Sequence, residues 1–102
     1  MPKKPRRIGE REQNLIQLYS YGQFRMTPQQ FHSKWDVKHE AIALICSRSI
    51  NTVRRWFCRG KTYRRPTPND LHHLALMDFL LEHYEEIPEQ LRTLLCSPSR
   101  NP

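Results

Sequence analysis

The chain has few of the features that mark secreted or membrane-spanning proteins. It has only 3 cysteines, at positions that form no Cys-x-x-Cys pair. An odd number without such a pair argues against a disulfide framework and favours a reducing compartment. No apolar run is long enough to span a bilayer, and the first residues contain no apolar signal core. We therefore expect a cytoplasmic protein.

Sequence patterns that carry catalysis or bind cofactors are also missing. No glycine-rich phosphate loop, paired carboxylates or Ser-His-Asp set can be found in the chain. The 5 histidines are scattered, and the adjacent His72 and His73 would diverge on a helix. We expect no enzyme activity, no metal, no cofactor and no small-molecule ligand.

What the chain does have is positive charge, unevenly distributed. It has 17 Lys and Arg against 10 Asp and Glu, a formal net charge of +7. No acid lies between Glu40 and Asp70, and after Asp70 acids predominate. This concentration of positive charge between residues 41 and 69 favours a polyanionic partner. A membrane surface is less favoured, because the cations do not flank an exposed apolar helix face.

The pattern of apolar residues and capping signals predicts helices only. A helix from Glu10 to Tyr21 should end at Gly22. The residues Thr27-Pro28-Gln29-Gln30 have the form of a capping box, so a second helix should begin there. This helix should end at a break around Asp36. The remaining helices are expected at 39–46, at 49–59 from the N-cap Ser49 to a stop at Gly60, at 68–84, and around Leu91, Leu94 and Leu95.

These elements predict an all-α fold, a compact bundle of five to six short helices. In a chain of 102 residues, every strongly apolar segment should join one core. We expect one helical domain over residues 9–96, with a helix-turn-helix at 38–60. A disordered basic arm at 1–8 and a disordered tail at 97–102 should flank it.

The segment from Val37 to Gly60 has a specific internal pattern. It combines Ile42-Ala43, a turn, a cap, and Thr52-Val53 followed by Arg55-Trp56. In this it resembles the bacterial helix-turn-helix DNA-binding regulator family. The resemblance implies that the small Ala43 lets the second helix cross closely above it, and that Val53 and Trp56 bury the back of that helix. The family usually has glycine where this chain has Ser47, and an apolar residue where it has Arg48.

The angular positions of residues in the fourth helix give it two different sides. At about 100° per residue, Val53, Trp56 and Phe57 fall on one side. The opposite side carries no acid, and consists of Ile50, Asn51, Arg54, Arg55 and Cys58. Arginine can bind guanine and asparagine can bind adenine with paired hydrogen bonds, and Ile50 can contact a thymine methyl group. We predict that Ile50, Asn51, Arg54 and Arg55 read bases. Cys58 is the thiol to watch for redox sensitivity.

Phosphate contacts are expected around this helix and from the arm. Cations at the end of a reading helix and in the following loop usually meet the DNA backbone. The predicted phosphate-binding residues are Lys3, Lys4, Arg6, Arg7, Arg48, Ser49, Thr52, Arg59, Lys61, Tyr63, Arg64 and Arg65.

The fifth predicted helix, 68–84, is apolar around most of its circumference. Only Asp78 interrupts the run from Leu74 to Leu81. A helix of this kind is usually buried on all sides. It is therefore either the central helix of the core or the contact of a homodimer, and both roles can hold together.

The sequence thus predicts a protein that binds double-stranded DNA with sequence specificity, as a transcriptional regulator. An alternative in the same class is the DNA-binding subunit of a recombination or mobile-element assembly. Two other classes stay open, an RNA-binding protein and a protein-interaction adaptor that docks through the fifth helix. Aromatic residues on an exposed face would favour RNA, but Trp56 and Phe57 are expected to point inward.

Overall fold

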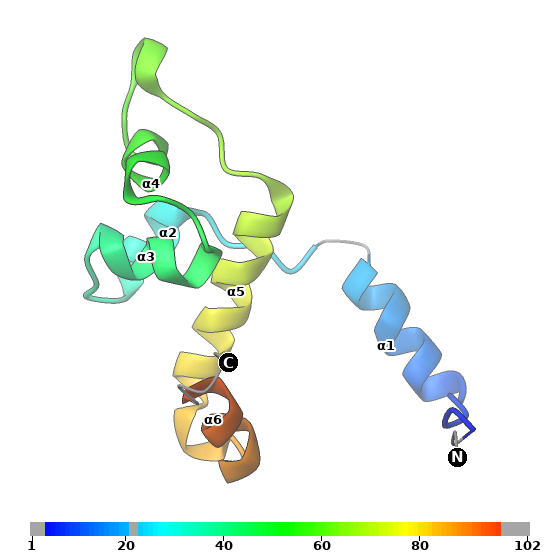
Figure 1. Ribbon diagram of the computed structural model, residues 1–102. Helices are drawn as coiled ribbons and strands as arrows, with labels where there is room; N and C mark the ends of the chain where they lie inside the picture. The colour runs from blue at the N-terminus through cyan, green and yellow to red at the C-terminus, as the bar shows by residue number, and fades with distance from the viewer. Residues whose placement is uncertain (1–3, 21–22, 97–102) are drawn as a thin grey trace.

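The computed structural model describes residues 4–20 and 23–96, and within them it contains helices and no strand (Figure 1). None of the described helices has the length and hydropathy needed to cross a membrane. The elements are α1 (Glu10–Ser20), α2 (Pro28–Lys34), α3 (His39–Cys46), α4 (Ile50–Trp56), the 3-10 turn η1 (Gly60–Thr62), α5 (Pro68–Glu82), the 3-10 turn η2 (Tyr84–Glu86) and α6 (Glu89–Cys96). The predicted stop at Gly22, the tail and the first residues of the arm lie outside the described residues.

Side-chain caps fix where three of these helices begin. Thr27 accepts from the Gln30 amide while the Gln30 side chain accepts from the Thr27 amide, so the predicted capping box of α2 is confirmed. Ser49 caps α4 by accepting from the Thr52 amide at 3.1 Å. Thr67 and Asp70 form a second capping box at the start of α5. In addition, α2 and α5 each begin with a proline, whose ring fixes φ near the helical value.

One hydrophobic core joins α2, α3, α4 and α5. Its largest fully buried side chains include Phe31 from α2, Ile42 from α3, Trp56 from α4 and Leu74 from α5. Ala43 and Val53 complete the contact between α3 and α4. These four helices form the compact part of the fold, and each contributes at least one side chain that water does not reach.

The expectation that every apolar segment joins the core is wrong for α1. This helix forms as predicted but buries no residue, and it stands away from the other helices in Figure 1. Its described link to the body is an edge-on ring contact between Tyr19 and His72 at 4.6 Å. The radius of gyration is accordingly 16.8 Å, where a compact domain of this length has about 13 Å.

Of the two roles expected for α5, that of a central helix covered on all sides by the rest of the chain is wrong. Its helix ends at Glu82, two residues before the expected Tyr84, and Phe79 is 51% exposed. The helices α2 and α3 pack against α5, but they leave Leu76 and Phe79 exposed. Asp78, which seemed to interrupt an apolar run, lies on the covered side: it accepts from Trp35 Nε1 at 2.9 Å and pairs with Lys34 at 2.8 Å.

An ion pair between the exposed Arg48 and the buried Asp70 ties the turn before α4 to the start of α5. Arg48 donates from Nε to Asp70 at 2.9 Å and from its terminal nitrogen at 3.2 Å, and Asp70 is 2% exposed. Burial alone would raise the pKa of the Asp70 carboxyl, but the bonds from Arg48 and Thr67 hold it below the ordinary 3.8. Where the family that this segment resembles usually has an apolar residue, this chain thus has Arg48, and the partner of Arg48 lies in α5.

We predict that Asp70→Ala destabilises the fold by about 1–3 kcal/mol, because it removes a helix cap and the partner of Arg48 together. Since folding lowers the pKa of Asp70, its contribution is complete above about pH 4 and is lost as the pH falls through the lowered pKa. Urea unfolding at pH 7 and pH 3 gives the free energy of unfolding of wild type and variant. The difference between the two should be smaller at pH 3 than at pH 7. The control Glu85→Ala, at an exposed position, should lose little stability at pH 7.

Candidate nucleic-acid interface

The connection between α3 and α4 consists of Ser47, Arg48 and Ser49. Ser47 has φ 56° and ψ 47°, and it is the one non-glycine residue with positive φ in the described part of the chain. Its amide bonds to the carbonyls of Ala43 and Leu44, and the Arg48 amide bonds to Ala43 at 2.9 Å. Ser47 therefore adopts the left-handed conformation for which glycine is normally used.

The two sides of α4 are divided as its angular pattern predicts. Val53 is 0% and Trp56 is 1% exposed, while Asn51, Arg54 and Arg55 are exposed. Ile50 is half-buried, so only part of it is available to a ligand. Phe57 packs against the core and stacks on His39 with ring centroids 4.3 Å apart. The outward side of α4 is thus an amide and two guanidinium groups.

The predicted end of this helix at Arg59 is wrong, because α4 ends at Trp56. Continuing it would require the amides of Arg59 and Gly60 to bond to the carbonyls of Arg55 and Trp56. Those carbonyls have other partners: Arg55 accepts from the amide of Arg64 at 3.1 Å, and Trp56 accepts from Gln29 Nε2 at 2.9 Å. Gly60, with φ 72°, begins η1 instead of capping α4.

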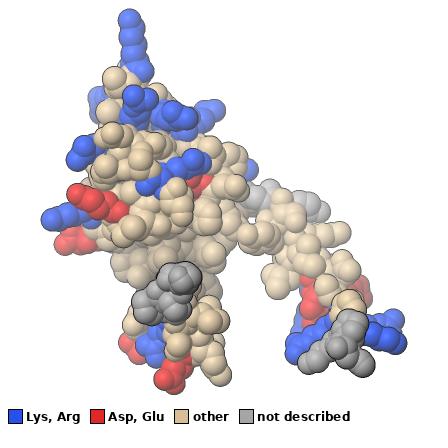
Figure 2. All heavy atoms as spheres, in the orientation of Figure 1, with Lys and Arg blue, Asp and Glu red and all other residues tan. Residues whose placement is uncertain are grey.

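The bond from the Arg64 amide brings the basic loop, residues 59–65, beside α4. Because the Arg64 amide bonds to the Arg55 carbonyl, the loop after η1 returns to the end of α4. Figure 2 shows Lys and Arg side chains gathered around α4 and η1. The exposed cations brought together here are Arg54, Arg55, Arg59, Lys61, Arg64 and Arg65. They form one field without an acid from residue 41 to residue 69.

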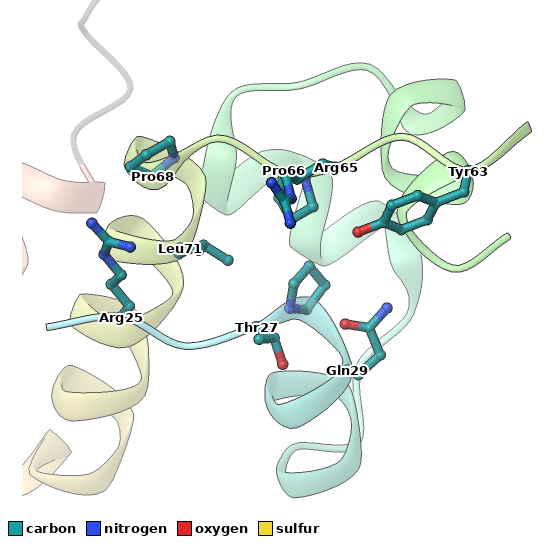
Figure 3. A pocket seen from close by; sticks show the side chains of 9 residues that line it. Arg25, Thr27, Gln29, Tyr63, Arg65, Pro66, Pro68 and Leu71 are labelled. Atoms are coloured by element: carbon teal, nitrogen blue, oxygen red, sulfur yellow. The ribbon is translucent and has the colours of Figure 1, made fainter. Parts of the chain in front are cut away.

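A cleft of about 460 Å³ lies beside this field. It runs between the starts of α2 and α5, and the Tyr63 hydroxyl and the Arg65 side chain face it (Figure 3). Its lining is Arg25, Thr27, Pro28, Gln29, Tyr63, Arg65, Pro66, Pro68 and Leu71. The cleft therefore continues the basic surface past the end of α4, with a phenol and an amide among its donors.

Several predicted phosphate contacts are engaged elsewhere or lie apart. Arg48 is bound to Asp70. The Ser49 hydroxyl donates to Thr52 Oγ1 at 3.0 Å, so both hydroxyls already take part in the cap of α4. Lys4, Arg6 and Arg7 precede α1 without regular secondary structure and lie far from α4 in Figure 1. Lys3 is outside the described residues.

The two cysteine side chains described here differ in environment. Burial, together with the charge of Asp70, raises the pKa of the Cys46 thiol to about 12, so this thiol stays protonated and inert. Cys58 is exposed just after the end of α4, with Sγ 3.3 Å from the Arg54 carbonyl. In the described part of the chain, no group of three or more His, Cys, Asp or Glu side chains is placed to hold a metal.

Sequence reasoning missed the residues that connect this surface to the body. Gln29 lines the cleft and bonds to the end of α4, and Arg25 lines the same cleft. Neither has a sequence signal, because each depends on contacts between distant segments. The role of Asp70 had a signal, since Thr67-Pro68-Asn69-Asp70 has the spacing of a capping box.

Comparison with known proteins adds no assignment: no family model matches the chain, and neither a curated protein nor a solved structure does so significantly.

We predict that Ser47→Gly leaves stability unchanged or raises it by up to about 1 kcal/mol, because glycine adopts positive φ without a steric cost. Ser47→Val should lower stability by about 1 kcal/mol or more, since a β-branched residue is strained there. Thermal unfolding measures both. The control is Ser33→Gly, within α2. Unlike Ser47→Gly, it should lower the stability, by about 0.5 kcal/mol, because glycine is unfavourable inside a helix. Equal losses at both positions would contradict the left-handed turn.

Proposed function

We propose that this protein binds double-stranded DNA with sequence specificity, as a transcriptional regulator, and that α4 enters the major groove as the second helix of a helix-turn-helix. The observation that carries the proposal is the division of α4 into two sides. Its inward side is held by the buried Val53 and Trp56, and its outward side presents Asn51, Arg54 and Arg55. The turn at Ser47 supports the same motif, because it has the backbone that the missing glycine would supply.

The outward groups suit base edges. Arginine can donate two hydrogen bonds to guanine O6 and N7, and asparagine can donate to and accept from adenine. A major groove about 12 Å wide accommodates one α-helix. Ile50 is half-buried and lies at the edge of this surface, where a thymine methyl group is a suitable contact.

The basic loop suits the DNA backbone on either side of the groove. Arg59, Lys61, Arg64 and Arg65 are exposed and follow α4 directly. The Tyr63 hydroxyl in the neighbouring cleft is a further donor to phosphate oxygens. Such contacts fix the position and orientation of a reading helix without themselves carrying sequence information.

At α4 itself, the positions of the aromatic residues favour duplex DNA over single-stranded RNA. Recognition of unpaired bases relies on aromatic side chains at the surface, on which bases stack. Trp56 is in the core, and Phe57 is stacked against His39. The outward side of α4 carries hydrogen-bonding groups and no aromatic ring.

Binding should depend steeply on salt. Each phosphate that is neutralised contributes about −0.9 to the slope of log affinity against log salt concentration. With four or more phosphate contacts from the basic loop, we expect a slope of about −3.5 or steeper. Fluorescence anisotropy with a labelled duplex between low and moderate salt measures it. Equal or tighter binding of single-stranded RNA of the same length would favour the RNA alternative.

Removing either outward arginine should weaken binding and leave the fold intact. We expect Arg54→Ala and Arg55→Ala each to cost about 1–3 kcal/mol of binding free energy if the side chain grips a base. Their melting temperatures should stay close to that of wild type, since exposed substitutions rarely matter to stability. Arg92→Ala in α6 is the matched control for charge, and it should bind as wild type does.

The pattern of loss separates base contacts from phosphate contacts. A base-reading arginine should lose discrimination at one position of a site selected from random duplexes, whereas a phosphate contact should weaken all sequences alike. If both variants are folded and bind DNA with wild-type affinity, the interface does not include the outward side of α4.

A further inference from the structure

Two apolar surfaces are largely uncovered within the described residues 4–20 and 23–96. The first is on α1, where Leu15, Ile16 and Leu18 fall on one side of the helix. Leu15 is 67% exposed, and the ring contact of Tyr19 with His72 is the described link from α1 to α5. A helix of 11 residues is only marginally stable in water on its own. The described part of the chain therefore leaves most of the apolar side of α1 without cover.

The second surface is formed by the end of α5 together with α6. Phe79, Leu91 and Leu94 are all exposed there, and Leu94 is 73% exposed. Two apolar hollows, of about 180 and 150 Å³, are lined by residues of both elements, and Leu80 and Ile87 border both hollows. This surface is at the opposite end of α5 from the basic field around α4 (Figures 1 and 2).

The charges around these two surfaces are of opposite sign. In residues 4–20, the cations Lys4, Arg6, Arg7 and Arg11 outnumber Glu10 and Glu12. Around α6 the order reverses, with acids at Glu82, Glu85, Glu86 and Glu89 against Arg92 alone. Lys34 pairs with Glu82 and His83 contacts Glu86, and the Glu86 side chain borders one of the hollows. Like charges would keep the two segments apart, whereas these charges attract each other.

We infer that α1 of one copy of this chain docks on the α5–α6 surface of a second copy, and that the exchange is reciprocal. The Leu15 side of α1 then covers the hollows beside Leu80 and Ile87. The basic residues before α1 lie against the carboxylates of η2 and α6. The dimer buries both unpartnered apolar surfaces at once and leaves the outward side of α4 open in each copy.

Three variants and a mixture test this arrangement. Leu15→Glu places a charge on the docking side of α1, and Phe79→Glu does the same at the edge of one hollow of the receiving surface. Both residues are exposed in the single chain, so neither change should alter the melting of an isolated copy. Gln17→Glu adds the same charge on the polar side of α1. Sedimentation equilibrium is measured for each variant, and native mass spectrometry is applied to an equimolar mixture of Leu15→Glu and Phe79→Glu.

Wild type and Gln17→Glu are expected to dimerise, and Leu15→Glu and Phe79→Glu should each raise the dimer dissociation constant about tenfold or more. The mixture should form mixed dimers more readily than either variant forms its own. In a mixed dimer, the intact α1 of the Phe79→Glu copy meets the intact surface of the Leu15→Glu copy.

Other results would overturn the inference. A wild-type monomer at every concentration, with Leu15→Glu lowering the melting temperature, would mean that α1 folds onto its own chain. A dimer unaffected by Leu15→Glu would mean that α5 and α6 pair without α1. These readouts do not involve DNA, so they stand or fall separately from the proposed function.

Discussion

The burial of Trp56 determines which side of α4 faces solvent. Its indole is enclosed by a core that draws on α2, α3 and α5, and Val53 is buried one turn earlier. With these two side chains fixed, the 3.6-residue repeat requires Arg54 and Arg55 to face outward. A single packing constraint thus creates both the stability of the α3–α4 unit and the surface proposed to meet DNA.

The rest of the body holds that constraint in place from several directions. Gln29 binds the last carbonyl of α4, and Arg64 binds the one before it, so the end of the helix is closed by two distant segments. The Arg48–Asp70 pair fixes the turn before α4 to α5. The bond from the Arg64 amide also brings the basic loop to this surface, and Gln29 lines the neighbouring cleft. We therefore regard the basic loop and the cleft beside Tyr63 as parts of one interface with α4.

Sequence reasoning succeeded where the determining contacts are local. The bounds of α3, the cap of α4 and the capping box of α2 follow from residues within four positions of one another. So does the sidedness of α4, because it depends on helical periodicity alone. The left-handed backbone of Ser47 was not predicted from its residue type, but the helix-turn-helix resemblance identifies the position as one where glycine is usual.

The errors have the opposite origin, because they depend on contacts between distant segments. The end of α4 was misplaced since Gln29 and Arg64 take the carbonyls that a longer helix would use. Arg48 was assigned to phosphate since its partner lies in α5. The isolation of α1 cannot be read from its apolar residues, which would look the same in a packed helix. The periodicity of apolar residues predicts which side of a helix is apolar. Which other segment packs against that side depends on the rest of the fold.

The central claim is that the outward side of α4 meets duplex DNA. An NMR titration of the isotope-labelled protein with a short duplex at low salt tests it most directly, because each backbone amide reports separately. The account predicts that the largest shifts fall on Asn51, Arg54, Arg55 and residues 59–65, with α6 unaffected. Shifts confined to α1 or α6, or none at low salt, would contradict it.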